Sequence, residues 1–551
     1  MRKPFARVLS ALSLLAAAAC GGSSAKPPPG AGFLRASGTR IVDGDGKPVF
    51  LKGVSFGNEV WANMALPDDH AEIDFQRLAD MGANSTRFLL NYLTFEDDAA
   101  PYVYKDAGWA WIDQNVAWAK THGIHLILNM HVPQGGFQSD GNGGALWTTS
   151  ENQNRLIALW REIARRYAGE PIIAGFGLVN EPEPLVSLQQ WQDLAVAIAS
   201  AIRAVDANHM IFVERPIAVA GSFNAAPDMN LFTIDDPNAV YEFHFYDPSD
   251  YTFQLEPWNG NPDGGSYPDP TKIAGVTEQW INLATFDAPT APAGTSAWTH
   301  YDGPRITASS AAIAAGKPTL VGQALGAGTI AFDDLTINEY DAAGTFTREI
   351  ARILPNTTSG WYFWSNNNVG TGSITARCIT SATCLTITGT TDDASWGGYA
   401  FYFAPRHGYQ YSISGWMMGT DLPAGAIARI RLDLIGSSTP VRVRDKPGLR
   451  DMMAPYLAWG AAHDVPLYLG EFGVYKACFA NDKGGLAWVG DVYDLATTGD
   501  GAPTSPRVAG LSYHQYHEDA FALYYGTGPV DPNNANQPLI DLLTARLHSG
   551  P

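Results

Sequence analysis

Two glutamates, each at the end of an apolar stretch, are the first residues of this sequence that could do chemistry. Glu181 closes IIAGFGLVNE (172–181), and Glu471 lies in VPLYLGEFG (465–473). A carboxyl group inside such a stretch costs free energy unless it finds partners. Two carboxyl groups at one site can divide acid–base work, because a hydrophobic or like-charged setting keeps a proton on one while an arginine keeps the other ionised.

Other polar side chains close further apolar stretches and offer such partners. They are Arg87 in RFLLNY, His131 in LILNMHVP, Asn180 beside Glu181, His244 and Tyr246 in YEFHFYDP, and Tyr513 and His514 in GLSYHQYHE. A convergent ring of these groups around two facing carboxyl groups suits cleavage of a glycosidic bond. One carboxylic acid would protonate the leaving oxygen, and the ionised one would attack the anomeric carbon.

Apolar stretches of strand length carry these residues. They lie at 50–56, 84–90, 124–132, 172–181, 210–214, 239–246, 465–473 and 508–516. Most alternate with segments of helical spacing, such as Leu156, Leu159 and Ile163, which indicates the α/β class with a parallel sheet. Eight such units favour a closed (β/α)8 TIM barrel, whose active site lies at the carboxyl ends of the strands. Strands four and seven would there bring Glu181 and Glu471 together from opposite sides.

A long interruption separates the sixth and seventh strands. Residues 251–305 are predicted to form an irregular connection, and residues 306–446 an inserted all-β sandwich. Period-two alternation with Gly and Pro punctuation supports the sandwich. It appears in GTIAFDDLTINEY (328–340), YAFYFAP (399–405), YQYSISGW (409–416) and AIARIRLDLI (426–435). The catalytic barrel is then expected in two parts, 33–250 and 447–551.

The first residues predict export. Basic residues precede a short apolar run in 1–19, which is too short to span a bilayer and is typical of a cleaved signal peptide. The run ends AAAC-GG, which resembles a bacterial lipoprotein signal, so Cys20 is predicted to carry lipid and 20–32 to form a tether. The expected location is the outer membrane or cell surface, or the medium if the protein is simply secreted.

Cysteine usage fits an exported protein. Cys378 and Cys384 have five residues between them, with no further His or Cys nearby to make a zinc site. We predict a disulfide between them, since export permits one. Cys478 is left over and is expected to be inert.

Composition restricts the partners. The 551 residues carry a formal charge of −20, and 11% are aromatic. A nucleic-acid partner is excluded, because such partners are bound mainly by Lys and Arg that neutralise phosphates. We expect a neutral ligand, membrane contact only through the N-terminal lipid, and a monomer.

The barrel segments resemble glycoside hydrolase family 5, of clan A. The opening GFLRASGTRIVDGDGKPVFLKGVSFGNE is similar to the family's N-terminal hairpin and first strand, and VNEPEP and LGEFG are similar to its fourth- and seventh-strand motifs. The resemblance implies that Glu181 is the general acid/base and Glu471 the nucleophile of a retaining hydrolase that needs no cofactor and no metal.

The same resemblance assigns supporting roles. Asn180 would bind the sugar 2-hydroxyl, Arg87 would stabilise the Glu471 carboxylate, and Tyr246 would hydrogen-bond it. His131 would shape the subsite of the cleaved sugar, and His244 would lie close to Glu181.

The eighth strand departs from the family. The family usually presents a Trp there, whereas this chain has SYHQYHE. Tyr513, His514 or Tyr516 would take its place.

The inserted sandwich resembles a carbohydrate-binding module. Its candidate sugar-stacking residues are Trp361, Trp364, Trp396 and Trp416, and the corresponding loop residues of the barrel are Trp61, Trp147, Trp258 and Trp298. A sandwich that merely walls the cleft, and a calcium site at Asp333 and Asp334, are the alternatives.

Three hypotheses follow for function. The first is a retaining β-glycosidase, endo-acting on a β-linked glucan, with a β-linked polysaccharide or oligosaccharide as substrate. A β-mannanase, or a glycosidase of glycosylceramide-type glycolipids, is the alternative within the same family. A non-catalytic glycan-binding surface lipoprotein is the alternative outside it.

Overall fold

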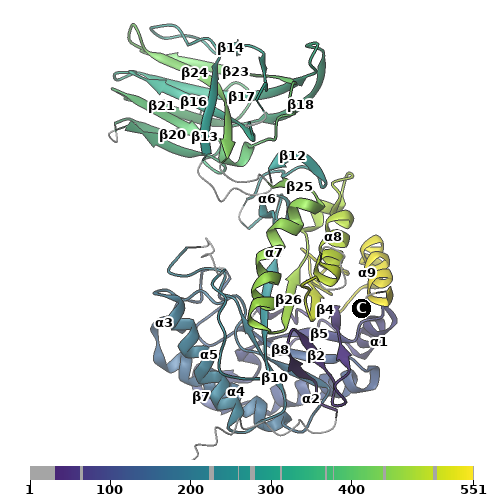
Figure 1. Ribbon diagram of the computed structural model, residues 1–551. Helices are drawn as coiled ribbons and strands as arrows, with labels where there is room; N and C mark the ends of the chain where they lie inside the picture. The colour runs from purple at the N-terminus through teal and green to yellow at the C-terminus, as the bar shows by residue number, and fades with distance from the viewer. Residues whose placement is uncertain are drawn as a thin grey trace, which may run out of the picture.

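The computed structural model in Figure 1 describes most of the chain. The described residues are 32–62, 66–139, 141–222, 229–258, 260–273, 280–310, 313–366, 369–376, 378–437, 442–499 and 505–549. The predicted signal peptide, the lipid-bearing Cys20 and all but the last residue of the tether lie outside these ranges and stay predictions. None of the helices among the described residues combines the length and apolarity needed to cross a membrane.

A closed barrel of eight parallel strands forms the larger unit, as the sequence predicted. In chain order its strands are β4 (Leu51–Val54), β5 (Ser85–Asn91), β8 (His125–Val132), β9 (Ile173–Gly177), β10 (Met210–Glu214), β11 (Ala239–Phe245), β26 (Leu467–Phe472) and β27 (Gly510–Tyr513). The hairpin β1 (Arg35–Ser37), β2 (Arg40–Val42) and β3 (Pro48–Val49) precedes the barrel.

Helices surround the barrel because each has one apolar stripe to bury. In α4, the residues Leu156, Leu159, Trp160 and Ile163 recur at helical spacing and are buried. The outer helices are α1 (Glu72–Asp80), α2 (Asp106–His122), α4 (Ser150–Tyr167), α5 (Leu188–Arg203), α7 (Lys446–His463), α8 (Gly485–Thr498) and α9 (Gln537–Ser549). Short elements in the loops are η1 (Val60–Ala62), η2 (Tyr92–Thr94), β6 (Glu96–Asp97), β7 (Ala100–Tyr104), α3 (Gly144–Thr148), η5 (Lys476–Phe479) and η6 (Pro532–Asn534).

The insertion leaves the barrel at the carboxyl end of β11 and returns at the start of α7. It begins with α6 (Ser249–Thr252), and β12 (Asp269–Ile273) pairs with β25 (Val443–Arg444) to form a two-stranded neck between the barrel and the sandwich (Figure 1). The buried guanidinium of Arg444 lies 2.6 Å from Asp250 of α6 and so joins this neck to the segment that follows β11. The sandwich is therefore attached on the edge of the barrel where the strands end.

Two antiparallel sheets make up the inserted domain. One has the order β13 (Trp280–Asp287), β24 (Ile427–Ser437), β16 (Ala315–Gln323), β22 (Asp393–Gly397) and β19 (Tyr362–Ser365). The other has the order β14 (Thr299–Asp302), β23 (Gln410–Thr420), β17 (Thr329–Tyr340), β21 (Thr383–Thr388) and β20 (Thr371–Ala376), with β15 (Ile306–Thr307) and β18 (Phe346–Ile353) at its side. The predicted disulfide joins Cys378 to Cys384 at the start of β21.

Two expectations for the insertion were wrong. Residues 251–305 are not all irregular, because β13 and β14 in this range are strands of the sandwich. They pair with β24 and β23, more than one hundred residues later, and such distant pairing leaves little local pattern. The stretch 399–405 is not a strand but begins with the 3-10 helix η4 (Tyr399–Phe401).

Candidate active site

Glu181 and Glu471 meet at the carboxyl ends of the barrel strands. Glu181 follows β9 and Glu471 lies near the end of β26. Carboxylate oxygens of the two lie within 4.8 Å of each other. The imidazole of His244, on β11, lies between them, with Nδ1 2.8 Å from Oε1 of Glu181 and 3.6 Å from Oε2 of Glu471. The two glutamates that the sequence singled out therefore share one site.

A fully buried arginine organises this site. Nη1 of Arg87, on β5, donates to Oε1 of Glu471 at 2.6 Å, and Nη2 donates to Oδ1 of Asn180 at 2.7 Å. Nη2 also donates to Glu214 at 3.2 Å, and Nε lies 2.7 Å from Glu242. One guanidinium thus faces three carboxyl groups from three neighbouring strands.

Positive groups and a phenol surround the carboxylate of Glu471. Tyr246 donates its hydroxyl to Oε2 at 2.8 Å, and Nδ1 of His514 lies 3.6 Å from Oε1. Burial opposes ionisation of Glu471, but the charges of His244, His514 and Arg87 outweigh it and hold the pKa of Glu471 well below its usual value. Glu471 is therefore an ionised carboxylate, as a nucleophile requires.

His244 contacts carboxyl groups through both ring nitrogens. While Nδ1 faces Glu181, Nε2 lies 3.3 Å from Glu214 and 3.6 Å from Glu242. Burial by itself would lower the pKa of His244, but the charges of Glu214 and Glu471 raise it well above its usual value. His244 is thus held as an imidazolium, which can donate from both nitrogens.

Glu214 and Glu242 belong to the site, although sequence reasoning missed them. Glu214 is the last residue of β10, and Glu242 lies inside β11; both are buried. Burial and the neighbouring Glu242 raise the pKa of Glu214 well above its usual value, against the opposing charge of His244. The signal was available, because Glu214 closes the apolar stretch MIFVE just as Glu181 closes its own.

His131 lies at the edge of the same site. It is buried near the end of β8, and its ring stacks on Phe137 at a centroid distance of 5.3 Å. Burial lowers the pKa of His131 well below its usual value. A neutral imidazole at this position contributes to the shape of the site without adding charge to it.

The eighth strand supplies His514 and not Tyr513. The side chain of Tyr513 is fully buried, and its hydroxyl donates to the carbonyl of Phe521 at 2.9 Å. The expectation that Tyr513 contacts substrate was wrong, because neighbouring residues of a strand face opposite ways and His514 faces Glu471. Tyr516 is also buried, donating to Asp74 at 2.8 Å. Of the three candidates, His514 is the one whose side chain lies beside Glu471.

The loop aromatics of the barrel divide into two kinds. Trp147 is buried and donates its indole N–H to Gln138, so it packs and does not stack on sugar. Trp61 is partly exposed and lines a cavity of about 350 Å³ together with Tyr92 and Phe137. Since Phe137 also packs on His131, this aromatic cavity lies beside the catalytic residues.

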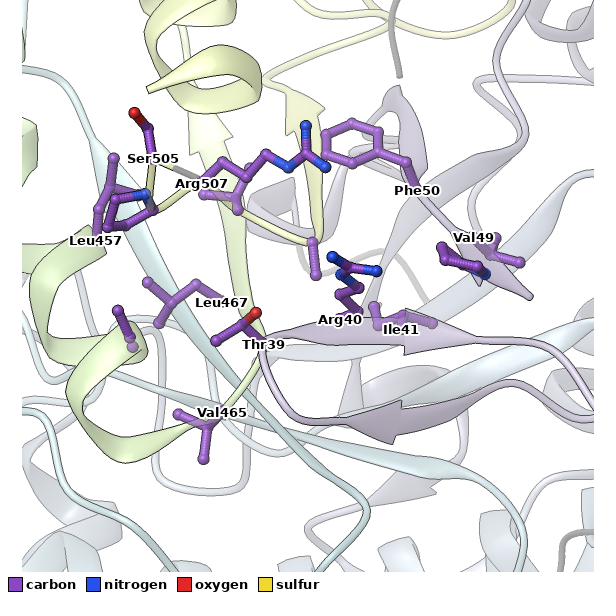
Figure 2. Close-up of a pocket in the computed structure, with 16 residues that line it drawn as sticks. Thr39, Arg40, Ile41, Val49, Phe50, Leu457, Val465, Leu467, Ser505 and Arg507 are labelled. Atoms are coloured by element: carbon purple, nitrogen blue, oxygen red, sulfur yellow. The ribbon is translucent and has the colours of Figure 1, made fainter. Parts of the chain in front are cut away.

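A second cavity lies at the other end of the barrel. Its volume is about 500 Å³, and it is lined by residues at the amino ends of β26 and β27, such as Leu467 and Ala509, and by Arg40 and Arg507 (Figure 2). Chemistry in this fold takes place at the carboxyl ends of the strands, so this larger cavity is not the active site.

The acidic clusters are arranged as ion pairs. Glu181, His244 and Glu471, and likewise Glu214, Glu242 and His244, place ligand-type atoms within 4.8 Å of one another. The guanidinium of Arg87 contacts members of both clusters, and its permanent charge disfavours a cation there.

The calcium alternative for the sandwich is not supported. Asp333 accepts the backbone N–H groups of Thr380 and Ser381, and Asp334 pairs with Arg352 through two hydrogen bonds. Both carboxylates therefore have protein partners already.

The first part of the chain is similar to a known family. Residues 42–300 match the family model described as cellulase (glycosyl hydrolase family 5). The match includes Arg87, Asn180, Glu181 and His244 and ends within the insertion, so the place of Glu471 in the site comes from the folded barrel alone.

Curated relatives match part of the chain. Endoglucanase C of Acetivibrio thermocellus is 29% identical over 217 residues, which are 38% of this chain and 61% of that protein. A β-xylosidase of Phanerodontia chrysosporium is 31% identical over 33% of this chain and 46% of its own length. Cellodextrinase A of Ruminococcus flavefaciens is 25% identical over 38% of this chain and 62% of its own. The chain thus spans about half to three-fifths of the length of these relatives.

Among solved structures, that of Thermotoga maritima Cel5A with cellobiose aligns with a TM-score of 0.46 and 14% identity, over 89% of this chain and 96% of that one.

Replacing Arg87 tests its central position. We expect Arg87→Met to lower the free energy of unfolding by about 3–5 kcal/mol, because the variant leaves buried carboxyl groups without their cation. Urea unfolding followed by tryptophan fluorescence measures this. Arg450→Met is the matched control, since Arg450 pairs with Asp451 in solvent, where a pair is worth about 0–1 kcal/mol. Equal losses in both variants would contradict the central role of Arg87.

Proposed function

We propose that the protein is a retaining β-glycoside hydrolase, endo-acting on a β-linked glucan. The observation that carries the proposal is the approach of Glu181 and Glu471 to within 4.8 Å. Retaining enzymes hold their two carboxyl groups about 5–5.5 Å apart, whereas inverting enzymes need about 6.5–9.5 Å to admit a water molecule. Nearest oxygens within 4.8 Å are compatible with the closer, retaining arrangement, in which one carboxylate attacks the sugar directly.

The environments of the two glutamates assign their roles. Glu471 is surrounded by Arg87, Tyr246 and His514, and is ionised; it attacks the anomeric carbon. Glu181 protonates the departing glycosidic oxygen, and a covalent glycosyl–enzyme ester forms on Glu471. Glu181 then takes a proton from water, which attacks the anomeric carbon and releases the sugar with Glu471 restored.

Supporting groups act on charge and orientation. Arg87 and Tyr246 hold the carboxylate of Glu471 in place for attack and receive it again when the ester breaks. Asn180 accepts from Arg87 through Oδ1. Its amide nitrogen donates one N–H to Ser139 at 3.4 Å and has a second N–H for the sugar 2-hydroxyl. No cofactor enters these steps.

The substrate class rests on the relatives. Endoglucanase C and cellodextrinase A are named for β-linked glucans, and the aromatic cavity of Trp61, Tyr92 and Phe137 offers flat surfaces for further sugar units. A mannan or a glycolipid substrate, and a purely glycan-binding protein, are the competing outcomes of the experiment below.

Substitution of the two glutamates tests the mechanism. Reducing ends released from a panel of β-glucans, mannans and xylans are measured for each variant, with a fluorescent glycosylceramide as a further substrate. We expect Glu181→Gln to lower turnover by about 10²–10⁴-fold and Glu471→Gln to lower it further, because the amide cannot form the covalent intermediate. Glu72→Gln on the outer helix α1 is the control and should retain full activity. Full activity in either catalytic variant would contradict its role, and release from mannan or glycolipid alone would replace glucan as the substrate.

The pH profile tests the state of Glu471. Because positive neighbours hold its pKa well below 4.5, Glu471 stays ionised as the pH falls through 4.5, and kcat/KM should decline only at lower pH. Removing one of these charges in His514→Asn should raise the pKa of Glu471 and move the acid limb of the profile to higher pH. Initial rates on a soluble oligosaccharide measure both profiles, and coincident acid limbs would contradict this account.

We further propose that the sandwich binds glycan through Trp364, one of the four expected tryptophans, together with two neighbouring tyrosines. Trp361 and Trp396 are buried in the sandwich core, so these two candidates were wrong. Trp364 is 50% exposed, and Tyr362 on the same face of β19 is 45% exposed. Tyr399, from η4, is 51% exposed, and its ring centroid lies 6.5 Å from that of Tyr362. We call these three residues the aromatic platform.

A glycine lets the aromatic platform lie flat on the sheet. Tyr362 pairs with Gly397 of β22, and a Cβ at Gly397 would lie 2.5 Å from the Tyr362 ring. The ring therefore rests over Gly397, and its hydroxyl accepts a hydrogen bond from Lys317 at 3.3 Å. A flat aromatic surface with one nearby charge suits the apolar face of a pyranose ring, and exposed apolar patches mark binding sites.

Binding experiments test the platform in a catalytically inactive background. In Glu471→Gln protein, we expect Trp364→Ala combined with Tyr362→Ala to weaken glucan affinity about tenfold, or ~1.4 kcal/mol. Affinity electrophoresis in gels containing β-glucan measures this. Phe346→Ala is the matched control, because Phe346 is 57% exposed on the other sheet. Unchanged glucan binding in the double variant would contradict a glycan platform. So would a double variant that binds glucan normally but no longer self-associates, because the platform would then be a contact between protein molecules.

A further inference from the structure

Glu214 takes no part in the proposed chemistry, yet it contacts Glu181, Arg87 and His244. It is buried at the end of β10. Its Oε1 accepts the backbone N–H of Glu181 at 2.8 Å, and its Oε2 accepts from Arg87 at 3.2 Å. The strand that carries Glu214 thereby reaches the residue that must donate the proton.

The backbone of Glu181 needs such support. Its φ is 41°, in the left-handed region that is unfavourable for a residue with a side chain. A residue in this conformation persists only when its surroundings hold it there. The hydrogen bond from its N–H to Glu214 is one such constraint, and it comes from a side chain that is itself fixed by Arg87.

A second route joins Glu214 to the carboxyl group of Glu181. Nε2 of His244 lies 3.3 Å from Oε1 of Glu214, and Nδ1 of the same ring lies 2.8 Å from Oε1 of Glu181. Because the ring is rigid, fixing Nε2 fixes the direction of Nδ1. Glu214 therefore contacts the main chain of Glu181 directly and its side chain through the imidazole.

We propose that Glu214 is the positioning residue of the acid/base, holding the strained backbone of Glu181 and, through His244, the direction of its carboxyl group. The inference rests on the proposed function, since it concerns the proton donor of that reaction.

The charged groups around Glu214 come from the neighbouring strands β9 and β11 and from β5 across the barrel. Arg87 faces it from β5, Glu242 and His244 from β11, and Glu181 from the end of β9. Glu242 is a matched comparison, because it is equally buried and contacts Arg87 and His244. Glu214 differs from Glu242 in one respect, because Glu214 also accepts the backbone N–H of Glu181. A positioning role for Glu214 predicts that the two glutamates differ in their effect on proton donation.

Two substrates separate proton donation from the rest of catalysis. A dinitrophenyl β-glycoside releases a stable phenolate and needs no proton from the enzyme, whereas a cello-oligosaccharide releases a sugar hydroxyl and does. We expect Glu214→Leu to lower kcat/KM for the oligosaccharide by about 100-fold, within the range of general acid catalysis, and to leave kcat/KM for the dinitrophenyl glycoside nearly unchanged. Glu242→Gln should change both substrates by the same factor.

A milder variant keeps the test decisive if Glu214→Leu does not fold. The amide of Glu214→Gln has one acceptor oxygen for two donors, the N–H of Glu181 and Arg87. We expect an intermediate loss on the oligosaccharide alone. Circular dichroism establishes folding of each variant, and added azide should accelerate turnover of the dinitrophenyl glycoside, because azide attacks the glycosyl–enzyme without a base.

The outcomes are distinct. Equal losses on both substrates in the Glu214 variants would overturn the inference and leave Glu214 a structural residue. A wild-type protein that cleaves neither substrate would overturn the proposed function itself. A selective loss on the oligosaccharide, with azide rescue, supports the positioning role.

Discussion

The buried guanidinium of Arg87 is the contact on which the rest of the site depends. It faces Glu471, Glu214 and Glu242, which come from three different strands. Charges removed from water are tolerated only when they are paired and hydrogen-bonded. The barrel therefore cannot close in this way unless the arginine and its carboxyl groups meet, and the same contact that satisfies burial also fixes the nucleophile at the centre of the strand ends.

Unequal surroundings then separate the two glutamates that we propose to be catalytic. Glu471 is deep and faces Arg87, Tyr246 and His514, so its ionised form is favoured. Glu181 is more open, with 15% of its side chain exposed, and its carboxyl group contacts His244. Burial and the neighbouring Glu242 raise the pKa of Glu214, against the opposing charge of His244. One network of buried charges thus gives Glu471 and Glu181 different surroundings.

Local sequence determined the framework of the protein. The eight barrel strands could be predicted because each is a short apolar stretch between helical patterns, and a parallel strand is buried on both faces. Arg87, Glu181 and Glu471 could be identified because an ionisable residue at the end of such a stretch needs a partner. The disulfide between Cys378 and Cys384 could be predicted from their short spacing in a chain expected to be exported. Each of these features is a property of a few neighbouring residues.

Only the tertiary structure decided which side chains face one another. Glu214 closes an apolar stretch as Glu181 does, whereas Glu242 lies inside its strand. Both join the site because β10, β11 and β26 follow one another around the barrel. The aromatic platform combines β19 with a later turn, whereas Trp361 and Trp396 face the core. Tyr513 faces away from the site that its neighbour His514 faces. The physical reason is common to all three cases: orientation on a strand alternates with every residue, so partners depend on register between segments far apart in the chain.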